Sequence, residues 1–166
     1  MASKYGAETT AEEIISDFGH VASNKYVIVT GANTGLGFET ARQLVGQRAK
    51  VVIACRSESS GNEAVANIKK EFPSGDVTFL PLDLASIASI RAFASAYKNT
   101  GKPLDILINN AGVAWWPLSY TSDGLEMHFG VNHIGHFLLT TELLDVLKRS
   151  GTATSPARVI KLSSFS

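Results

Sequence analysis

The sequence of 166 residues has little charge, a single cysteine and no long apolar run. Charged residues make up 18% of the chain, and 15 basic side chains balance 15 acidic ones. A chain without a basic excess or a basic stripe is not expected to bind nucleic acid or an anionic membrane surface. No apolar stretch approaches the roughly 18 residues that a membrane-spanning helix needs, so we expect no membrane span.

The single cysteine, Cys55, excludes a disulfide framework and fits a reducing compartment. Residues 1–15, MASKYGAETTAEEII, lack the basic and then apolar pattern of a secretory signal. We therefore expect a cytoplasmic protein. The sequence contains neither an HExxH motif nor a cysteine pair, so no metal site is predicted.

Apolar residues make up 45% of the chain, which fits one globular domain at this length. Five apolar runs are typical of strands: Lys25–Thr30, Lys50–Ala54, Val77–Leu82, Leu104–Asn109 and Arg158–Ser163. Four segments with helical spacing separate them: Gly35–Gln47, Ser57–Glu71, Ser86–Lys98 and Asp123–Arg149. This alternation predicts an α/β fold with a doubly wound parallel sheet (a Rossmann fold) of order 3-2-1-4-5. A ligand crevice is expected between the first and fourth strands.

Residues 1–24 read as a polar leader ahead of this Rossmann domain, which we place at residues 25–166. Thr10 and Glu13 have the spacing of a capping box, which predicts a short helix through about Phe18. This helix could pack across the bottom of the sheet or form a frayed arm. Packing is the interpretation that we favour.

The stretch VIVTGANTGLG, residues 27–37, places three glycines between the first strand and the helix that follows it. Gly31 allows a sharp exit from the strand, Gly35 leaves room for a pyrophosphate, and Gly37 lets the helix lie close to the sheet. The free N–H groups at the start of that helix would bind the phosphates. An ordinary glycine-rich turn is the alternative, but the strand-loop-helix context favours dinucleotide binding. The loop residues predicted to contact the dinucleotide are Gly31, Asn33, Thr34, Gly35, Leu36 and Gly37.

The end of the second strand bears on the choice of coenzyme. A carboxylate there would bind the adenosine ribose and favour NAD, but the chain has Cys55 followed by Arg56. The planar guanidinium of Arg56 suits a 2′-phosphate, and a hydrogen bond to a charged group is worth about 1.5–3 kcal/mol. The sequence thus favours NADP over NAD, although Arg56 could also be a surface residue without a ligand.

The TGxxxGxG spacing resembles that of the short-chain dehydrogenase/reductase family, and the likeness extends over about residues 25–164. Four further stretches match the family: Asp83-Leu84, Asn109–Gly112 (NNAG), Asn132 within FGVNHIGHF, and Ser163-Ser164. The stretches CRS at 55–57, LDLAS and NHIGHFLLT look most like the retinol-dehydrogenase-like branch.

The resemblance implies hydride transfer between a nicotinamide and an apolar alcohol or carbonyl, and a homodimer in the full-length form. It places the adenine against Asp83 and Leu84, although Asp83 could instead cap the helix that follows. It places the coenzyme against the bare backbone of Ala111 and Gly112, while Asn110 joins neighbouring strands.

Two catalytic roles follow from the same resemblance. Asn132 would bind a water in a proton relay, and Ser164 would hydrogen-bond the substrate carbonyl. Asparagine is a poor helix former, and the sequence around Asn132 is apolar, which predicts a buried amide. The apolar neighbours are Phe129, Ile134, Phe137 and Leu138.

Two further groups of side chains leave alternatives open. His133 and His136, with His128 nearby, could suggest a metal, but helix packing explains them better. Trp115-Trp116 follows the NNAG stretch and could line an apolar substrate pocket or cover the core.

The family's proton donor is a tyrosine with a lysine four residues later, expected downstream of Ser164. None of the tyrosines present has such a lysine: Tyr5, Tyr26, Tyr97 and Tyr120. We therefore expect that the sequence is less than the whole gene product, that the fifth strand is an open edge, and that the chain alone is inactive. Two hypotheses remain: an NADP-dependent oxidoreductase as the parent protein, and a dinucleotide-binding module without turnover.

Overall fold

The computed structural model describes residues 4–6, 8–115 and 117–163. Its strands are β1 (Tyr26–Thr30), β2 (Lys50–Cys55), β3 (Val77–Pro81), β4 (Ile106–Asn109) and β5 (Arg158–Lys161). They form one parallel sheet of order β3-β2-β1-β4-β5, as predicted, so the order reverses between β1 and β4. In the register, Ile28 of β1 lies between Val52 of β2 and Leu107 of β4.

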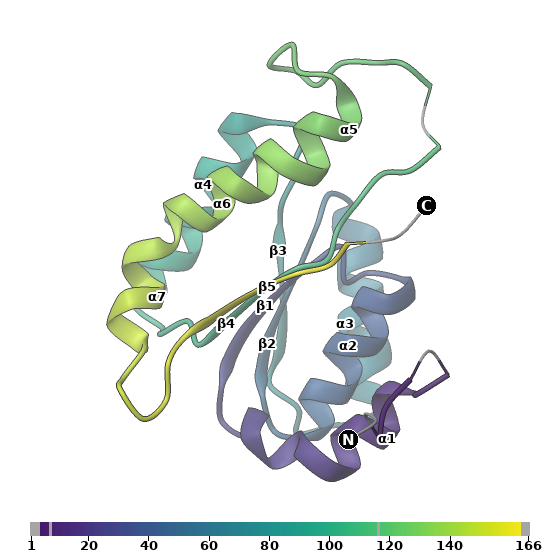
Figure 1. Cartoon of the computed structure of the whole chain (residues 1–166), viewed down its shortest axis with the longest axis vertical. Helices are drawn as coiled ribbons and strands as arrows, with labels where there is room; N and C mark the ends of the chain where they lie inside the picture. The colour runs from purple at the N-terminus through teal and green to yellow at the C-terminus, as the bar shows by residue number, and fades with distance from the viewer. Residues whose placement is uncertain (1–3, 7, 116, 164–166) are drawn as a thin grey trace.

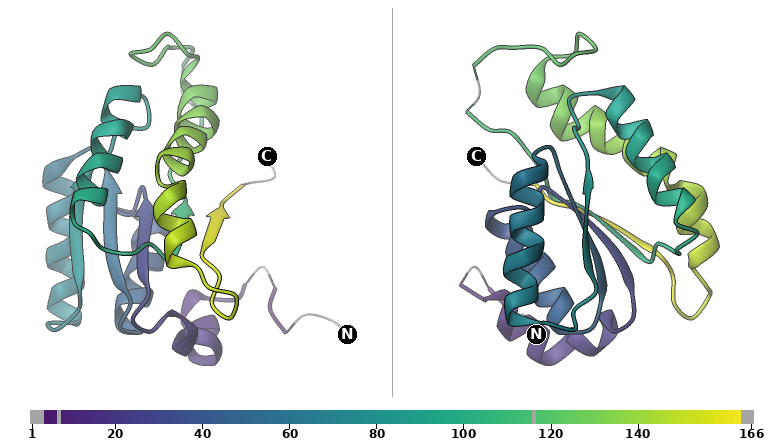
Figure 2. Two further views of the ribbon diagram at one scale, coloured as in Figure 1. Left: turned by 90° about the vertical axis from the view of Figure 1, so that its left-hand side faces the viewer. Right: turned by 180° about the vertical axis from the view of Figure 1, so that it is seen from behind.

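Helices cover both faces of the sheet (Figures 1 and 2). They are α2 (Gly35–Gly46) and α3 (Glu58–Glu71) on one face, and α4 (Ile87–Asn99), α6 (His136–Glu142) and α7 (Leu144–Ser150) on the other. Successive side chains of a strand point to opposite faces. Ile28 therefore joins the core under α4, α6 and α7, whereas Val27 and Val29 join the core under α2 and α3. Burial on both faces explains why these strands read as continuous apolar runs.

The predicted element ends differ from the observed ones by at most two residues, apart from the last helical region. Ser57 and Ser86, predicted as first helical residues, are instead the N-caps of α3 and α4. Their hydroxyls accept the N–H groups of Ser60 and Ser89, which the first turn of a helix leaves without intrahelical partners.

The prediction of one continuous helix over Asp123–Arg149 is wrong. The helical part begins only at α5 (Met127–Phe129) and continues through the π-helix η2 (Gly130–Gly135) into α6. Leu143, with ψ near 0°, separates α6 from α7.

The chain is closely packed at both ends of η2. A Cβ added at Gly130 would lie 2.5 Å from the Thr121 side chain, and one at Gly135 would lie 2.6 Å from the Leu84 carbonyl oxygen. Ahead of α5, the Glu126 carboxylate accepts the N–H groups of His128 and Phe129, which ends the preceding turn and starts the helix.

At the N-terminus, Thr10 and Glu13 form the predicted capping box of α1 (Ala11–Phe18), which continues into the 3₁₀ helix η1 (Gly19–Ala22). The helix α1 lies against α2 at the end of the sheet where the strands begin (Figure 1). This placement supports packing rather than a frayed arm. Among the described residues, no helix is both long and apolar enough to cross a membrane.

Candidate functional site

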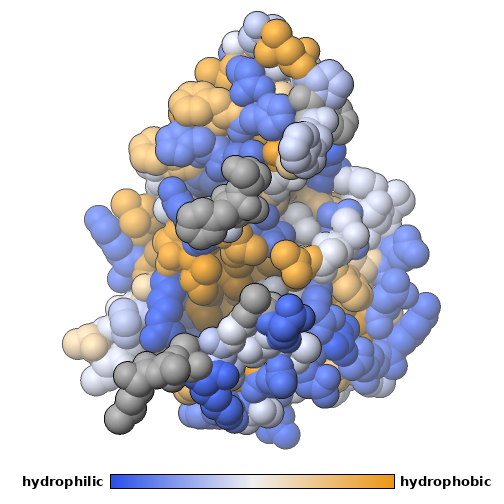
Figure 3. Space-filling model, turned by 45° about the vertical axis from the view of Figure 1, so that its right-hand side comes forward, coloured by the Kyte–Doolittle hydropathy of each residue, from blue (hydrophilic) through white to orange (hydrophobic). Residues whose placement is uncertain are grey.

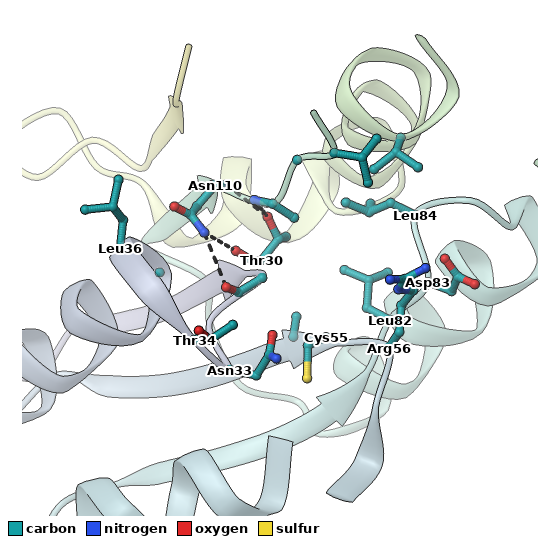
Figure 4. Close-up of a pocket in the computed structure, with 17 residues that line it drawn as sticks. Thr30, Asn33, Thr34, Leu36, Cys55, Arg56, Leu82, Asp83, Leu84 and Asn110 are labelled. Atoms are coloured by element: carbon teal, nitrogen blue, oxygen red, sulfur yellow. Dashed lines mark hydrogen bonds between the residues drawn. The ribbon is translucent and has the colours of Figure 1, made fainter. Parts of the chain in front are cut away.

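A pocket of about 450 Å³ opens at the carboxyl ends of β1, β2, β3 and β4, where open parallel sheets bind ligands (Figure 4). Eleven of the twelve residues predicted to contact a dinucleotide line it: Gly31, Asn33, Thr34, Leu36, Gly37, Arg56, Asp83, Leu84, Asn110, Ala111 and Gly112. The twelfth, Gly35, lies in the same loop at the first position of α2. The fold therefore brings four separate stretches of sequence to one cavity.

The three glycines of the loop meet different surroundings. Gly31 has φ +65°, and a Cβ there would lie 2.9 Å from the Ala111 Cα. A Cβ at Gly37 would lie 2.4 Å from the Asn110 Nδ2. The sequence predicts that this glycine lets α2 lie close to the sheet, and the structure shows that the close approach is to the residue that follows β4. Gly35 has φ +60° and no described atom within 4 Å of an added Cβ, which leaves space for a ligand there.

The start of α2 has free hydrogen-bonding capacity facing this pocket. Thr34 is the N-cap in extended conformation, but its side chain makes no capping hydrogen bond, unlike Ser57 and Ser86 at the starts of α3 and α4. The first N–H groups of a helix and its dipole together favour an anion. An uncapped helix start beside an open glycine position is a site of the right kind for phosphate.

Arg56 and Asp83 lie at the other end of the pocket, beyond β2 and β3 (Figure 4). Arg56 is exposed, so its guanidinium is free to meet a ligand from solvent. The alternative role of Asp83 as a helix cap is wrong, because Ser86 caps α4 and Asp83 accepts the N–H of Ala85 in the turn before it. Cys55 also lines the pocket, and burial raises the pKa of its thiol.

The wall of the pocket at Asn110–Val113 is joined to the end of β1 by hydrogen bonds. The Asn110 Nδ2 donates to the Thr30 carbonyl oxygen at 2.8 Å, which is the predicted link between neighbouring strands (Figure 4). The Thr30 Oγ1 accepts the N–H groups of Asn110 and Ala111. The Asn110 N–H also donates to the Ile108 carbonyl oxygen. The fully buried Thr30 thus holds the wall from beneath.

Asn132 lies in η2, but the prediction that its amide is buried in apolar surroundings is wrong. The residue is exposed, and the side chains of Phe129 and Phe137 are more than half exposed. Its Oδ1 accepts the Val113 N–H at 2.8 Å, and its Nδ2 donates to the Val113 carbonyl oxygen at 2.9 Å. Asn132 therefore holds the far end of the same wall.

The histidines make contacts within the protein, as the packing interpretation requires. The buried His136 has its Nε2 2.9 Å from the Thr30 Oγ1, and burial lowers its pKa. His128 pairs with Glu126, and the ring of His133 packs on that of Phe129. Within the described ranges, no group of three or more metal-ligating side chains comes together.

Several residues at the site were missed by the sequence argument, and two predictions lie outside the described residues. The additional lining residues are Thr30, Ala54, Cys55, Leu82, Val113 and Val131. Most of them could have been found from their places at strand ends. Trp115 is 96% exposed with φ +56° and does not cover the core, whereas Trp116 and Ser164 are not among the described residues.

Comparison with known proteins also points to the short-chain dehydrogenase/reductase family. The family model for short chain dehydrogenases matches residues 25–166. The chain is 52% identical to retinol dehydrogenase 12 of Mus musculus over 141 residues, which are 85% of this chain and 43% of that protein. It is 46% identical to the WW domain-containing oxidoreductase of Gallus gallus over 163 residues, which are 98% of this chain and 38% of that protein.

Solved structures show the same fold. The Pseudomonas aeruginosa RhlG/NADP active-site complex has a TM-score of 0.75 at 33% identity, covering 86% of this chain and 55% of that one. A metagenomic short-chain oxidoreductase in complex with NADP has a TM-score of 0.71 at 26% identity, covering 88% and 65%. The chain spans about two fifths of the length of the curated relatives that it matches. On the family match, the identities and the strand order together, the chain belongs to the short-chain dehydrogenase/reductase family.

Proposed function

We propose that this chain is the NADP-binding part of an oxidoreductase that interconverts an alcohol and a carbonyl on an apolar small molecule by hydride transfer. The observation that carries the proposal is the uncapped start of α2 beside Gly35, in a pocket at the reversal point of the strand order. These N–H groups would bind the pyrophosphate of the coenzyme. When bound, the nicotinamide supplies or accepts the hydride.

NADP rather than NAD is proposed from the end of β2. The pocket has no carboxylate at Cys55 or Arg56, and the exposed Arg56 lines it. Its guanidinium would form charge-assisted hydrogen bonds to a 2′-phosphate. The NADP complexes among the similar solved structures support this choice.

The protein's own groups would also serve the proton transfer. Asn132 is proposed to hold a relay water. Each polar atom of its side chain makes one hydrogen bond to Val113, which leaves one lone pair on Oδ1 and one proton on Nδ2. Ser164 is proposed to polarise the substrate carbonyl.

A binding module without turnover is the second candidate for the chain by itself, since no tyrosine here has a lysine four residues later. NADPH oxidation with retinoid and aliphatic carbonyls distinguishes the two. Turnover only when the chain is extended to the length of its relatives supports the oxidoreductase as parent and the module as fragment. No turnover in either form contradicts the enzyme proposal. Homodimerisation of the longer form and a cytoplasmic location remain predictions.

Calorimetric titration with NADPH and NADH tests the binding proposal directly. We expect the wild-type chain to prefer NADPH by tenfold or more, because a charged hydrogen bond is worth about 1.5–3 kcal/mol. Arg56→Asp should shift the preference toward NADH. Lys102→Asp makes the same charge change in an exposed loop at the opposite end of the sheet, and should leave it unchanged.

Two results would count against the proposal. Absence of binding heat for either coenzyme, with a folded chain by circular dichroism, contradicts dinucleotide binding. Unchanged selectivity in Arg56→Asp contradicts the role of Arg56 while leaving the phosphate site at α2 intact.

A further inference from the structure

His136, the first residue of α6, joins two parts of the site that are far apart in the sequence. Its Nε2 lies 2.9 Å from the Thr30 Oγ1 at the end of β1, and its Nδ1 lies 3.4 Å from the Asn132 carbonyl oxygen in η2. The residue is 4% exposed and does not line the pocket. Any effect of His136 on a ligand must therefore pass through the residues that it contacts.

Hydrogen-bonding capacity fixes the state of this ring. A threonine hydroxyl has one proton and two lone pairs. The N–H groups of Asn110 and Ala111 occupy both lone pairs of the Thr30 Oγ1, at 3.0 and 2.9 Å. The Thr30 proton then goes to the nearer acceptor, the His136 Nε2 at 2.9 Å, rather than to the Ile108 carbonyl at 3.4 Å. His136 is thereby neutral, with its proton on Nδ1 facing the Asn132 carbonyl.

The two residues that His136 contacts hold opposite ends of the same pocket wall. Thr30 accepts the N–H groups of Asn110 and Ala111, and Asn132 pairs with both main-chain groups of Val113. The backbone oxygen of His136 is in turn bonded by Thr140, which also accepts from Asn109 in β4. The ring thus lies at the centre of a hydrogen-bonded network that spans β1, β4 and η2.

We propose that His136 is a positioning residue of the coenzyme site. As a neutral imidazole it orients the Thr30 hydroxyl and the Asn132 segment, and through them it fixes the wall Asn110–Val113 where the coenzyme lies. This proposal rests on the dinucleotide binding proposed above. It predicts an effect on the part of the coenzyme that meets this wall, and little effect at the Arg56 end of the pocket.

The first test uses the chain without coenzyme. Imidazole ¹⁵N signals that show a protonated Nδ1 and a bare Nε2 support the network, whereas a protonated Nε2 overturns it. Amide hydrogen exchange is then compared between wild type and His136→Phe. We expect faster exchange at Asn110 and Ala111 in the variant. The control is His133→Phe, because that exposed ring is one turn away and packs on the exposed ring of Phe129.

The second test measures affinity for NADPH and for 2′,5′-ADP, which lacks the nicotinamide half. His136→Phe should weaken NADPH about three- to tenfold, the worth of one lost neutral hydrogen bond. Binding of 2′,5′-ADP should change less than twofold. His136→Gln, whose amide both donates and accepts, should restore most of the NADPH affinity. Equal NADPH affinity and equal exchange in wild type and His136→Phe overturn the proposal.

A second pair of variants covers the case in which His136→Phe does not fold. Thr30→Val keeps the shape but removes the hydroxyl and should reproduce the faster exchange, and Thr30→Ser should reverse it. If Thr30→Val leaves hydrogen exchange at Asn110 and Ala111 unchanged, the proposed network is overturned. If the wild-type chain binds no NADPH, the proposed function fails, but faster exchange at the two amides still supports the network.

Discussion

Gly35 and Gly37 stand two residues apart in one loop, yet a methyl group would meet very different surroundings at each position. At Gly37 it would collide with the Asn110 amide and the Gly31 carbonyl oxygen, whereas at Gly35 it would enter open space. This difference agrees with the roles expected from the sequence, a ligand requirement at Gly35 and a packing requirement at Gly37.

We expect Gly37→Ala to lower the free energy of unfolding by about 1–3 kcal/mol, as overpacking does. Gly35→Ala should cost only about 1 kcal/mol for its positive φ, but should weaken NADPH binding more than tenfold by filling the phosphate space. Thermal unfolding and coenzyme titration measure the two effects. Gly6→Ala, where the added Cβ has no described neighbour within 4 Å, is the control. Wild-type NADPH affinity in Gly35→Ala contradicts the assignment.

His136 also predicts a pH dependence of stability. Burial holds its pKa below the ordinary value of about 6.5, and Lys161 on β5 acts in the same direction, whereas the Asn132 carbonyl opposes them. Below about pH 6.5 the unfolded chain takes up a proton that the folded ring resists. The free energy of unfolding therefore falls as the pH decreases, by at most about 1.4 kcal/mol per pH unit for this group.

Denaturant unfolding at pH 7.5 and 5.5 measures this contribution. The acid-induced loss should be smaller in His136→Phe than in wild type by about 1 kcal/mol. His133→Phe should resemble wild type, since that ring is exposed. An equal loss in all three proteins contradicts a buried neutral His136.

Among the elements, the starts of the helices differ in a way that matches their surroundings. The hydroxyls of Ser57 and Ser86 cap α3 and α4, whereas the Thr34 hydroxyl leaves the start of α2 open to the pocket. In the region after β4, too, an irregular helical segment lies beside the pocket. There the π-helix η2 carries Asn132 toward Val113, and π-turns are frequent at functional sites.

Alanine substitutions test this difference between the helix starts. Ser57→Ala and Ser86→Ala should each lower the free energy of unfolding by about 1 kcal/mol, because each removes a capping hydrogen bond. Thr34→Ala removes no such bond and should cost less than half as much. Chemical denaturation provides the measurement. Equal losses at the three positions would mean that Thr34 caps α2 in solution.

Over the whole molecule, one edge of the sheet is left exposed to solvent. The strand β5 lies at one edge, every residue of it is exposed, and Val159, Ile160 and Leu162 are each at least 40% exposed. Figure 3 shows apolar side chains gathered around a hollow on one face of the molecule. An exposed apolar edge strand is a site for pairing with another chain.

We expect Ile160→Lys to reduce concentration-dependent self-association of this chain, because a charge on an edge strand opposes strand pairing. Leu118→Lys adds the same charge at an exposed loop residue away from the sheet and should have little effect. Static light scattering over a concentration series compares the variants. The prediction fails if Ile160→Lys associates as strongly as Leu118→Lys.

The sequence by itself determined what depends on local patterns. Apolar runs and helical spacing predicted the sheet and its strand order, and three glycines between a strand and a helix predicted the pocket at the start of α2. The elements and the loop follow from backbone preferences and burial within short segments, and the strand order follows from the usual topology of alternating strands and helices. Only the tertiary structure decided the π-turn around Asn132, its exposure, and the contact between His136 and Thr30. Those two residues are 106 positions apart. Whether polar groups so far apart in the sequence form a hydrogen bond depends on how the helices pack against the sheet.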